Sequence, residues 1–370
     1  MVTDNMTTMQ VAMTMLPKLN STSLLPLFEK CGGIDGFFRE SEKSLSFLCG
    51  EYRLSPGTYD RKSALAEAEK EQENMDRHDI RILTFEDSRY PFLLRQCPDT
   101  PLSFFYRGEI QAGEATYLGV VGTRKASEHC KARVGSILNE LKEMGHRPVI
   151  VSGLAYGIDA AGHRASLSCL FKTYAVLGHG LHMIYPASHK NLAEQIVAQG
   201  GALISEFPCS ARILPVNFLQ RNRIIAGLCH AVLIAESAEK GGAMATARIA
   251  QSYDREILAI PGRPEDKMSA GCNLLIKENV AALTENGTDV AKALHLDYRK
   301  KEPVQTSLNF IETADEGAII LQILSVQGGM NIDELNIRSG IPMKELSALL
   351  LQFELEGKVI SLPGKNYILS

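Results

Sequence analysis

The chain has 370 residues and a formal net charge of −4, with 45% apolar and 22% charged residues. These values are ordinary for a folded globular protein and exclude collagen-like, coiled-coil and wholly disordered chains. No apolar run reaches the roughly 18 residues that a membrane span needs. The N-terminus lacks a secretory signal pattern, and the eight cysteines form no Cys-x-x-Cys pair. We therefore expect a cytoplasmic protein of two or three domains with reduced thiols.

Residues 1–78 have the pattern of a small helical domain. Apolar clusters at Leu24–Phe28 and Phe37–Leu48 are separated by Gly32-Gly33, and glycine commonly ends a helix. Residues 64–77 are rich in Ala, Glu and Lys and indicate a solvated helix. Such short helices resemble SAM or helix-hairpin-helix modules. The net negative charge of residues 1–118 favours a packing domain over a DNA-binding one.

From residue 79 to residue 296, short apolar segments alternate with helical ones. The segments that predict strands are 82–84, 102–106, 117–121, 149–152, 173–177, 202–205, 231–235 and 257–260. Continuous apolar strands separated by helices are typical of a parallel sheet covered on both faces. We therefore predict an α/β fold, a Rossmann-like doubly wound parallel sheet, for residues 79–296.

Residues 297–312 contain a lysine pair, a proline and many polar residues, which indicates a linker. Helices are predicted after it at 314–324, 332–338 and 343–355, followed by a hairpin around Pro363-Gly364. Three helices and a hairpin within residues 313–370 are typical of a winged-helix domain.

Two glycine-containing loops follow predicted strands of the middle domain, where an open α/β sheet binds its ligands. Gly122-Thr123-Arg124-Lys125 follows strand 117–121 and combines a tight turn with two cations placed at the start of a helix. Gly241-Gly242 begins a helix after strand 231–235, and the backbone N–H groups of such a turn can bind an anion. The sequence contains no Walker motif at this turn. Both loops lie in the middle of the chain, where residues 119–295 carry a net positive charge.

The segment from Cys209 to Ala235 contains no acidic residue. It does contain Arg212, Phe218, Arg221, Asn222 and Arg223. Arginines beside an aromatic ring suit single-stranded nucleic acid, because they pair with phosphates while the ring stacks on a base. We also expect Arg221 or Arg223 to pair with Glu206 or Glu236.

Other polar residues of these loops carry weaker signals. Gly153 belongs to a glycine-rich turn into a helix, on which Asp159 and His163 lie four residues apart. This spacing fits an acid–base pair or a buried structural hydrogen bond, and we favour the structural interpretation. His179 and His182 have no third ligand at a zinc-like spacing, so we predict no metal and no cofactor.

In their order along the chain, these motifs resemble the DprA/Smf family, the bacterial DNA-processing proteins of natural transformation. The resemblance rests on Gly122-Thr123-Arg124, Ser152-Gly153, Asp159, His163, Gly178, Gly180, Tyr185-Pro186, Ser205-Glu206, Pro208, Phe218, Arg221 to Leu228, Thr246-Ala247, Pro261-Gly262 and Gly271 to Ile276.

The resemblance implies a Rossmann-type core, often with a helical N-terminal domain and a C-terminal winged helix. It also implies sequence-independent binding and protection of single-stranded DNA, dimer formation, and loading of the RecA recombinase onto incoming strands, without catalytic activity. The family's DNA pocket maps onto Arg124, Phe218 and the arginines that follow. Three features depart from the family pattern. Thr123 stands where the family usually has serine, and Gly241-Gly242-Ala243-Met244 replaces a turn that usually contains Ser-Gly-Ser. The lysine often found just before the Phe is absent, since Leu214-Pro215-Val216-Asn217 occupies that stretch, and Arg212 is its expected substitute.

The predicted DNA-binding set combines the loop residues and the arginine-rich segment. It consists of Gly122, Thr123, Arg124, Lys125, Gly153, Arg212, Phe218, Arg221, Asn222, Arg223, Gly241 and Gly242.

Two alternatives remain. A nucleotide-processing hydrolase of the phosphoribohydrolase type would use the glycine pair before Thr246 with a carboxylate such as Glu236. The helix glutamate usual in those enzymes is replaced here by Ala250. The winged helix could also read DNA, but its helix at 343–355 is net negative, which opposes contact with phosphates. We predict a protein-interaction or regulatory role for that domain.

Overall fold

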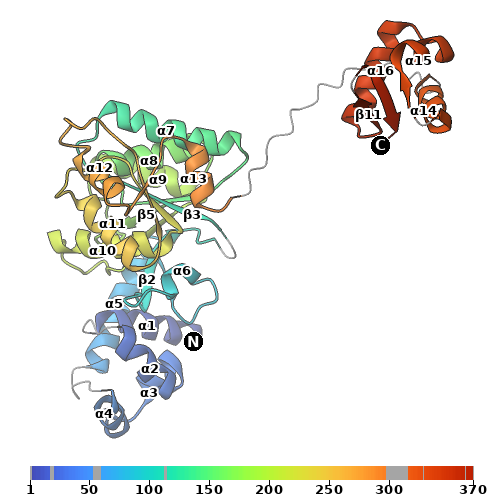
Figure 1. Ribbon diagram of the computed structural model, residues 1–370. Coiled ribbons are helices and arrows are strands. Elements are labelled where there is room, and N and C mark those ends of the chain that lie inside the picture. Colours follow the sequence, from blue (N-terminus) through green and yellow to red (C-terminus); the bar gives the residue numbers. More distant parts are fainter. Residues whose placement is uncertain are drawn as a thin grey trace. The chain divides into compact units, whose positions relative to one another are not determined.

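The computed structural model describes residues 2–16, 21–52, 60–111, 115–296, 316–327, 329–362 and 364–369. The described residues up to 296 belong to one compact unit and those from 316 onward to a second (Figure 1). The predicted linker at 297–312 lies outside the described residues, and the predicted domain boundaries stay predictions.

Within the described part of the first unit, nine strands form one sheet (Figure 1). Its order is β1-β2-β6-β5-β4-β3-β7-β8-β9. The strands are β1 (Arg81–Thr84), β2 (Ser103–Gly108), β3 (Tyr117–Val121), β4 (Val149–Ser152), β5 (Thr173–Leu177), β6 (Ala202–Ser205), β7 (Ala231–Ile234), β8 (Glu256–Ala259) and β9 (Ala282–Leu283). Strands β3 to β9 pair in parallel, whereas β2 pairs antiparallel with both β1 and β6. The carboxyl ends of the parallel strands therefore share one edge.

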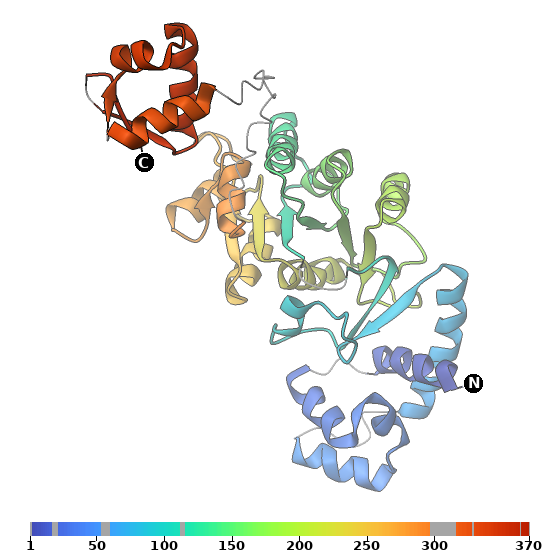
Figure 2. The ribbon, with the colours of Figure 1, turned by 90° about the vertical axis from the view of Figure 1, so that its right-hand side faces the viewer.

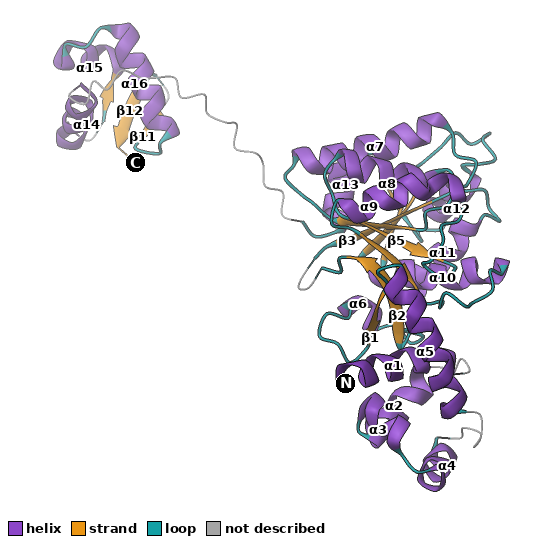
Figure 3. Cartoon of the chain, turned by 180° about the vertical axis from the view of Figure 1, so that it is seen from behind, coloured by secondary structure: helices purple, strands orange, loops and turns teal. Residues whose placement is uncertain are grey.

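Helices cover both faces of this sheet, as Figures 2 and 3 show from two further directions. The helices are α6 (Phe92–Arg95), α7 (Glu128–Glu143), α8 (Ile158–Ser168), η1 (Ala187–His189), α9 (Lys190–Ala198), α10 (Pro215–Leu228), α11 (Gly242–Ser252), α12 (Ala270–Lys277) and α13 (Gly287–Ala293). Helices α7, α8, α9 and α13 lie on one face, and α10 and α11 lie on the other. The predicted doubly wound fold is confirmed.

The N-terminal helices belong to this first unit and pack against its α/β part. They are α1 (Val2–Met15), α2 (Ser21–Cys31), α3 (Gly33–Arg39), α4 (Glu42–Glu51) and α5 (Arg61–Arg77). Their buried side chains, among them Phe28 and Phe37, belong to the same apolar cluster as Leu154 and Leu181 of the sheet loops. The prediction that 64–77 is a solvated helix is wrong in part, because one side of α5, including Ala68 and Met75, is buried.

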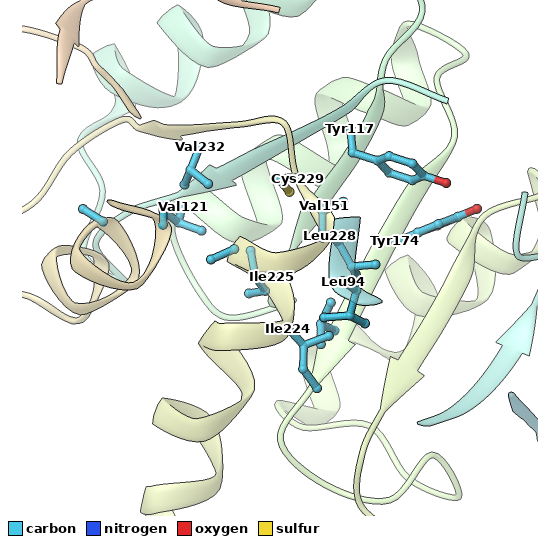
Figure 4. Close-up of a cluster of buried hydrophobic side chains, with 14 of the residues drawn as sticks. Leu94, Tyr117, Val121, Val151, Tyr174, Ile224, Ile225, Leu228, Cys229 and Val232 are labelled. Atoms are coloured by element: carbon cyan, nitrogen blue, oxygen red, sulfur yellow. The ribbon is translucent and has the colours of Figure 1, made fainter. Parts of the chain in front are cut away.

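Helix α10 is anchored to the sheet by the C-terminal half of its sequence. Ile224, Ile225 and Leu228 are fully or almost fully buried and belong to the same apolar cluster as Val121 and Val151 (Figure 4). Burying each such side chain contributes about 1.5–3 kcal/mol. This packing fixes the helix on the sheet and brings its N-terminal half to the edge where the parallel strands end.

The second unit consists of α14 (Glu316–Gln327), β10 (Met330–Asn331), α15 (Ile332–Ser339), α16 (Met343–Leu355), β11 (Val359–Leu362) and β12 (Asn366–Leu369). Its sheet has the order β10-β12-β11. The helical spacing of Leu346, Leu350 and Phe353 places these residues of α16 in the core of the unit. The predicted winged-helix fold is confirmed. Among the helices that the structure describes, none combines the length and apolar character required to cross a bilayer.

Candidate nucleic-acid interface

A cavity of about 370 Å³ opens at the edge where β3, β4 and β7 end. This volume matches a small-molecule or nucleotide site. The cavity is lined by Val121, Gly122, Thr123, Arg124, Ala155, Asp159, Pro215, Phe218, Leu219, Arg221, Asn222, Ile225, Ser237, Ala238, Gly241, Gly242, Ala243, Thr246 and Met268. Eight of the twelve residues that the sequence predicts for DNA binding are in this set.

The loop after β3 brings an exposed guanidinium group to the cavity. A Cβ atom at Gly122 would lie 2.4 Å from Cγ1 of Ile158, so this tight turn requires glycine. The Thr123 N–H donates to the Glu236 carbonyl at 2.7 Å, which fixes the loop. Arg124, the next residue, is exposed and makes no ion pair among the described residues.

The expectation that Arg124 and Lys125 stand at a helix start is wrong. Helix α7 begins only at Glu128, and the Ser127 side chain caps it by accepting from the Cys130 N–H. The Lys125 N–H donates instead to Oγ1 of Thr123 at 3.2 Å. Both cations therefore lie in the loop, where Arg124 lines the cavity and Lys125 does not.

One face of α10 forms a wall of the cavity. Phe218, Arg221, Asn222 and Ile225 follow the helical spacing i, i+3, i+4 and i+7, so they share that face. The helix begins at Pro215, a position that proline favours because its missing N–H has no helical partner. The Phe218 ring is half-buried and approaches close to Gly178, where an added Cβ would lie 3.0 Å from its Cδ1 atom.

The cavity wall contains a buried pair of opposite charges, Arg221 and Asp159. Arg221 is 4% exposed and Asp159 is 7% exposed. Burial lowers the pKa of Arg221, and the nearby Asp159 carboxylate opposes this shift. Burial also raises the pKa of Asp159, and the nearby Arg221 guanidinium opposes that one. Nε and Nη1 of Arg221 have no hydrogen-bond partner in the described protein. Two buried donors of a cation thus remain to be satisfied beside the cavity.

The start of helix α11 forms another part of the cavity lining. Its N-cap is Gly241, and no side chain caps it. Gly241, Gly242 and Thr246 all line the cavity. A helix N-terminus presents backbone N–H groups and a partial positive charge, which suit an anion such as phosphate. Together with Arg124, this end makes the cavity suitable for a phosphorylated ligand with a planar ring against Phe218.

Four predicted residues do not line the cavity: Lys125, Gly153, Arg212 and Arg223. The Arg223 guanidinium pairs with Glu206 and also donates to the Asp99 carbonyl, which confirms the expected pairing of one arginine with Glu206. Because Arg223 is two positions from Arg221, its side chain leaves α10 in a different direction. Gly153 instead lies against the Arg221 guanidinium.

The histidines of these loops have structural partners. Nδ1 of His163 is 2.7 Å from Oγ1 of Thr173, and His163 does not hydrogen-bond Asp159, so the two form no acid–base pair. His179 is buried, and its Nε2 accepts from the Tyr185 N–H at 3.2 Å. Over the described ranges, no three His, Cys, Asp or Glu side chains are arranged to hold a metal ion.

Sequence reasoning missed the part of the cavity wall formed by Ser237, Ala238 and Met268. These residues carry no charge or motif that would mark them. Only the position of their loops, which follow β7 and β8 at the same sheet edge, indicates a place near the ligand.

Comparisons with known proteins point to one family. Residues 81–295 match the family model described as DNA recombination-mediator protein A, and residues 307–365 match the DprA winged helix domain. Protein Smf of Escherichia coli strain K12 is 34% identical over 287 residues, which cover 76% of this chain and 76% of that protein.

Two solved structures resemble the chain. The X-ray structure of DNA processing protein A from Streptococcus pneumoniae has a TM-score of 0.62 at 29% identity and covers 77% of this chain and 95% of that one. The structure of DNA processing protein A from Helicobacter pylori, described as giving insight into its single-stranded DNA binding mode, has a TM-score of 0.52 at 28% identity. It covers 59% of this chain and 97% of that one.

Proposed function

The chain belongs to the DNA recombination-mediator protein A family, and on this premise we propose that it binds single-stranded DNA at the cavity beside α10. The observation that carries the proposal is the juxtaposition of three groups around one cavity: the Arg124 guanidinium, the Phe218 ring and the start of α11. Among the described residues, Arg124 forms no ion pair and no side chain caps α11. Arg124 and the helix end would bind phosphates, and the ring would stack on a base. None of these groups reads a base edge, so binding would be independent of sequence.

Within that function we propose that the protein protects incoming DNA and loads the RecA recombinase during transformation and recombination. It would act in the cytoplasm as a homodimer, with single-stranded DNA and RecA as partners, without a membrane and without a cofactor. The family membership supports this role, as does the relative in Streptococcus pneumoniae that is named a DNA processing protein.

We propose a binding protein rather than a nucleotide hydrolase. Glu236, the carboxylate that the hydrolase alternative would use, does not line the cavity; its Oε2 accepts from the Ser127 N–H at 2.8 Å, at the start of α7. The carboxylate that does line the cavity, Asp159, is buried and accepts from the Ala155 N–H at 3.3 Å. Release of free base from mononucleotides incubated with the protein would favour the hydrolase.

The winged helix is proposed as an interaction or regulatory module. Helix α16 carries Lys344 against Glu345 and Glu354, and Glu356 follows directly after it. A helix of this charge would be repelled by a phosphate backbone. The DNA-binding role therefore stays with the cavity of the first unit.

A gel-shift experiment tests the proposal directly. The full chain is mixed with a labelled oligothymidylate or with a duplex of equal length, each at a low and a high salt concentration. We expect the single strand to be retained more tightly, with affinity falling as salt rises, because phosphate contacts release counterions. Equal or weaker retention of the single strand would contradict the proposal.

A further inference from the structure

Two tyrosines outside the cavity are exposed on loops at the same edge of the sheet. Tyr185 is 52% exposed and Tyr156 is 50% exposed. Tyrosine is an amphipathic residue that usually buries its ring and leaves only its hydroxyl in water. Half-exposed rings beside a ligand cavity therefore point to an additional contact surface.

Tyr185 extends the aromatic wall of the cavity. Its ring centroid lies 5.8 Å from that of Phe218, at an angle of 51° between the ring planes. Its backbone N–H donates to the buried ring of His179, which anchors the loop after β5. The backbone of Tyr185 is therefore held in place, and its exposed ring lies next to the Phe218 ring that lines the cavity.

Tyr156 lies beside the loop that carries Arg124. A Cβ at the next residue, Gly157, would be 2.2 Å from the Thr123 carbonyl oxygen, so the two loops are in direct contact. The Tyr156 ring packs edge-on against His189 with centroids 5.0 Å apart, and its hydroxyl is 3.1 Å from Oγ of Ser188. This ring is also held in place while half of it remains open to solvent.

The charges of the surrounding segments favour a polyanion. Residues 153–157, 178–190 and 207–219 contain no Asp or Glu. The exposed Lys190 and Arg212 belong to these segments and form no ion pair in the part of the chain that the structure describes. A single strand of DNA that leaves the cavity along these segments would meet their positive charges, and none of their side chains would be a carboxylate.

We propose that Tyr185 and Tyr156 are stacking platforms for unpaired bases that flank the nucleotide in the cavity. The proposal rests on the proposed function and adds a second, aromatic part to the same site. A tyrosine ring stacks on any base because every base has a π face, so this extension keeps binding independent of sequence. Tyrosine also loses little conformational entropy on binding, because two torsions fix its ring.

The test uses the full chain with Tyr185→Leu and Tyr156→Leu, which keep apolar bulk and remove the π face. Tyr185→Phe and Tyr156→Phe keep the ring. Phe47→Leu removes an exposed ring, 70% exposed on α4 of the N-terminal helices, as a matched control. Binding is measured by fluorescence anisotropy for an oligothymidylate of about 12 nucleotides. Thymidine dinucleotide is measured by competition against it.

We expect each leucine variant to bind the longer oligomer about five-fold more weakly or worse, since stacking on one aromatic ring contributes at least that much. The dinucleotide should lose little affinity, because it fits the cavity alone. The phenylalanine variants and Phe47→Leu should bind as the unmodified chain does.

Unchanged affinity of both leucine variants for the longer oligomer would overturn the proposal. An equal loss for the dinucleotide and the longer oligomer would also overturn it, because the tyrosines would then act only by supporting Phe218. Both outcomes leave the proposed function intact. That function fails separately, if the unmodified chain binds neither ligand or if Arg124→Ala binds both without loss.

Discussion

Gly153 leaves the space that the guanidinium group of Arg221 fills: a Cβ atom at this glycine would lie 1.4 Å from Nη1 of Arg221. The loop after β4 and the middle of α10 therefore meet so closely that a larger residue at position 153 would have to displace the Arg221 guanidinium. Arg221 is buried in the cavity wall. A residue that carries no functional group thus sets the position of a charged one.

Gly153→Ala is expected to destabilise the protein and to weaken DNA binding together. The added methyl group must displace a buried arginine, and overpacking of this kind costs about 1–3 kcal/mol. Urea unfolding measures the loss of stability and fluorescence anisotropy measures the loss of affinity.

Gly135→Ala is the matched control for that substitution. Gly135 lies within α7, and nothing stands within 4 Å of its added Cβ. Alanine there should stabilise the helix by up to about 1 kcal/mol. If Gly153→Ala were as stable as this control, the assigned position of Arg221 would be wrong.

Arg124→Ala is expected to weaken oligonucleotide binding and to flatten its salt dependence. Arg124 is exposed and unpaired over the described residues, so its removal should leave stability nearly unchanged. Losing one phosphate contact lowers the slope of log affinity against log salt by about 0.7 for a single strand. Anisotropy titrations at several salt concentrations measure both quantities. Arg164→Ala is the control, because it removes another exposed arginine, on α8. It should change neither the affinity nor the salt slope. An unchanged slope for Arg124→Ala would contradict the assignment of Arg124 to a phosphate.

Arg223→Ala is expected to have the opposite profile, with a large effect on stability and a small one on binding. The Arg223 and Glu206 side chains are only 17% and 16% exposed, and the substitution leaves a poorly solvated carboxylate without its cation. Charged hydrogen bonds of this kind contribute about 1.5–3 kcal/mol. A double-mutant cycle with Glu206→Gln, followed by urea unfolding, measures the coupling. A loss of DNA affinity equal to that of Arg124→Ala, without loss of stability, would restore the predicted DNA contact for Arg223.

The fold was predictable where apolar segments are continuous. Strands β3, β4, β5 and β6 match the predicted segments residue for residue. Strands buried on both faces are continuous apolar segments, so their first and last residues can be recognised in the sequence. The site was predictable for the same reason: parallel strands bring the loops that follow them to one edge, so Arg124 and Gly241 had to lie near each other.

The direction of side chains and long-range burial of charge were not predictable. Arg221 and Arg223 look equivalent in the sequence, yet one faces the cavity and the other faces Glu206. Glu71 looks like an exposed residue of a charged helix but is 1% exposed. It accepts from the backbone N–H groups of Cys209 and Ser210, and no local pattern indicates partners so far along the chain.

His163 is expected to make the stability of the protein depend on pH. Burial lowers the pKa of His163 to about 3, from the usual histidine value of about 6.5. Between these two values the unfolded chain binds a proton that the folded chain does not, so stability is fully present above about pH 6.5 and falls as pH decreases toward 3. The slope that one such proton contributes is up to about 1.4 kcal/mol per pH unit. Urea unfolding at several pH values within this window should show a shallower slope for His163→Gln, whatever its absolute stability, and an identical slope would show that another group causes the dependence.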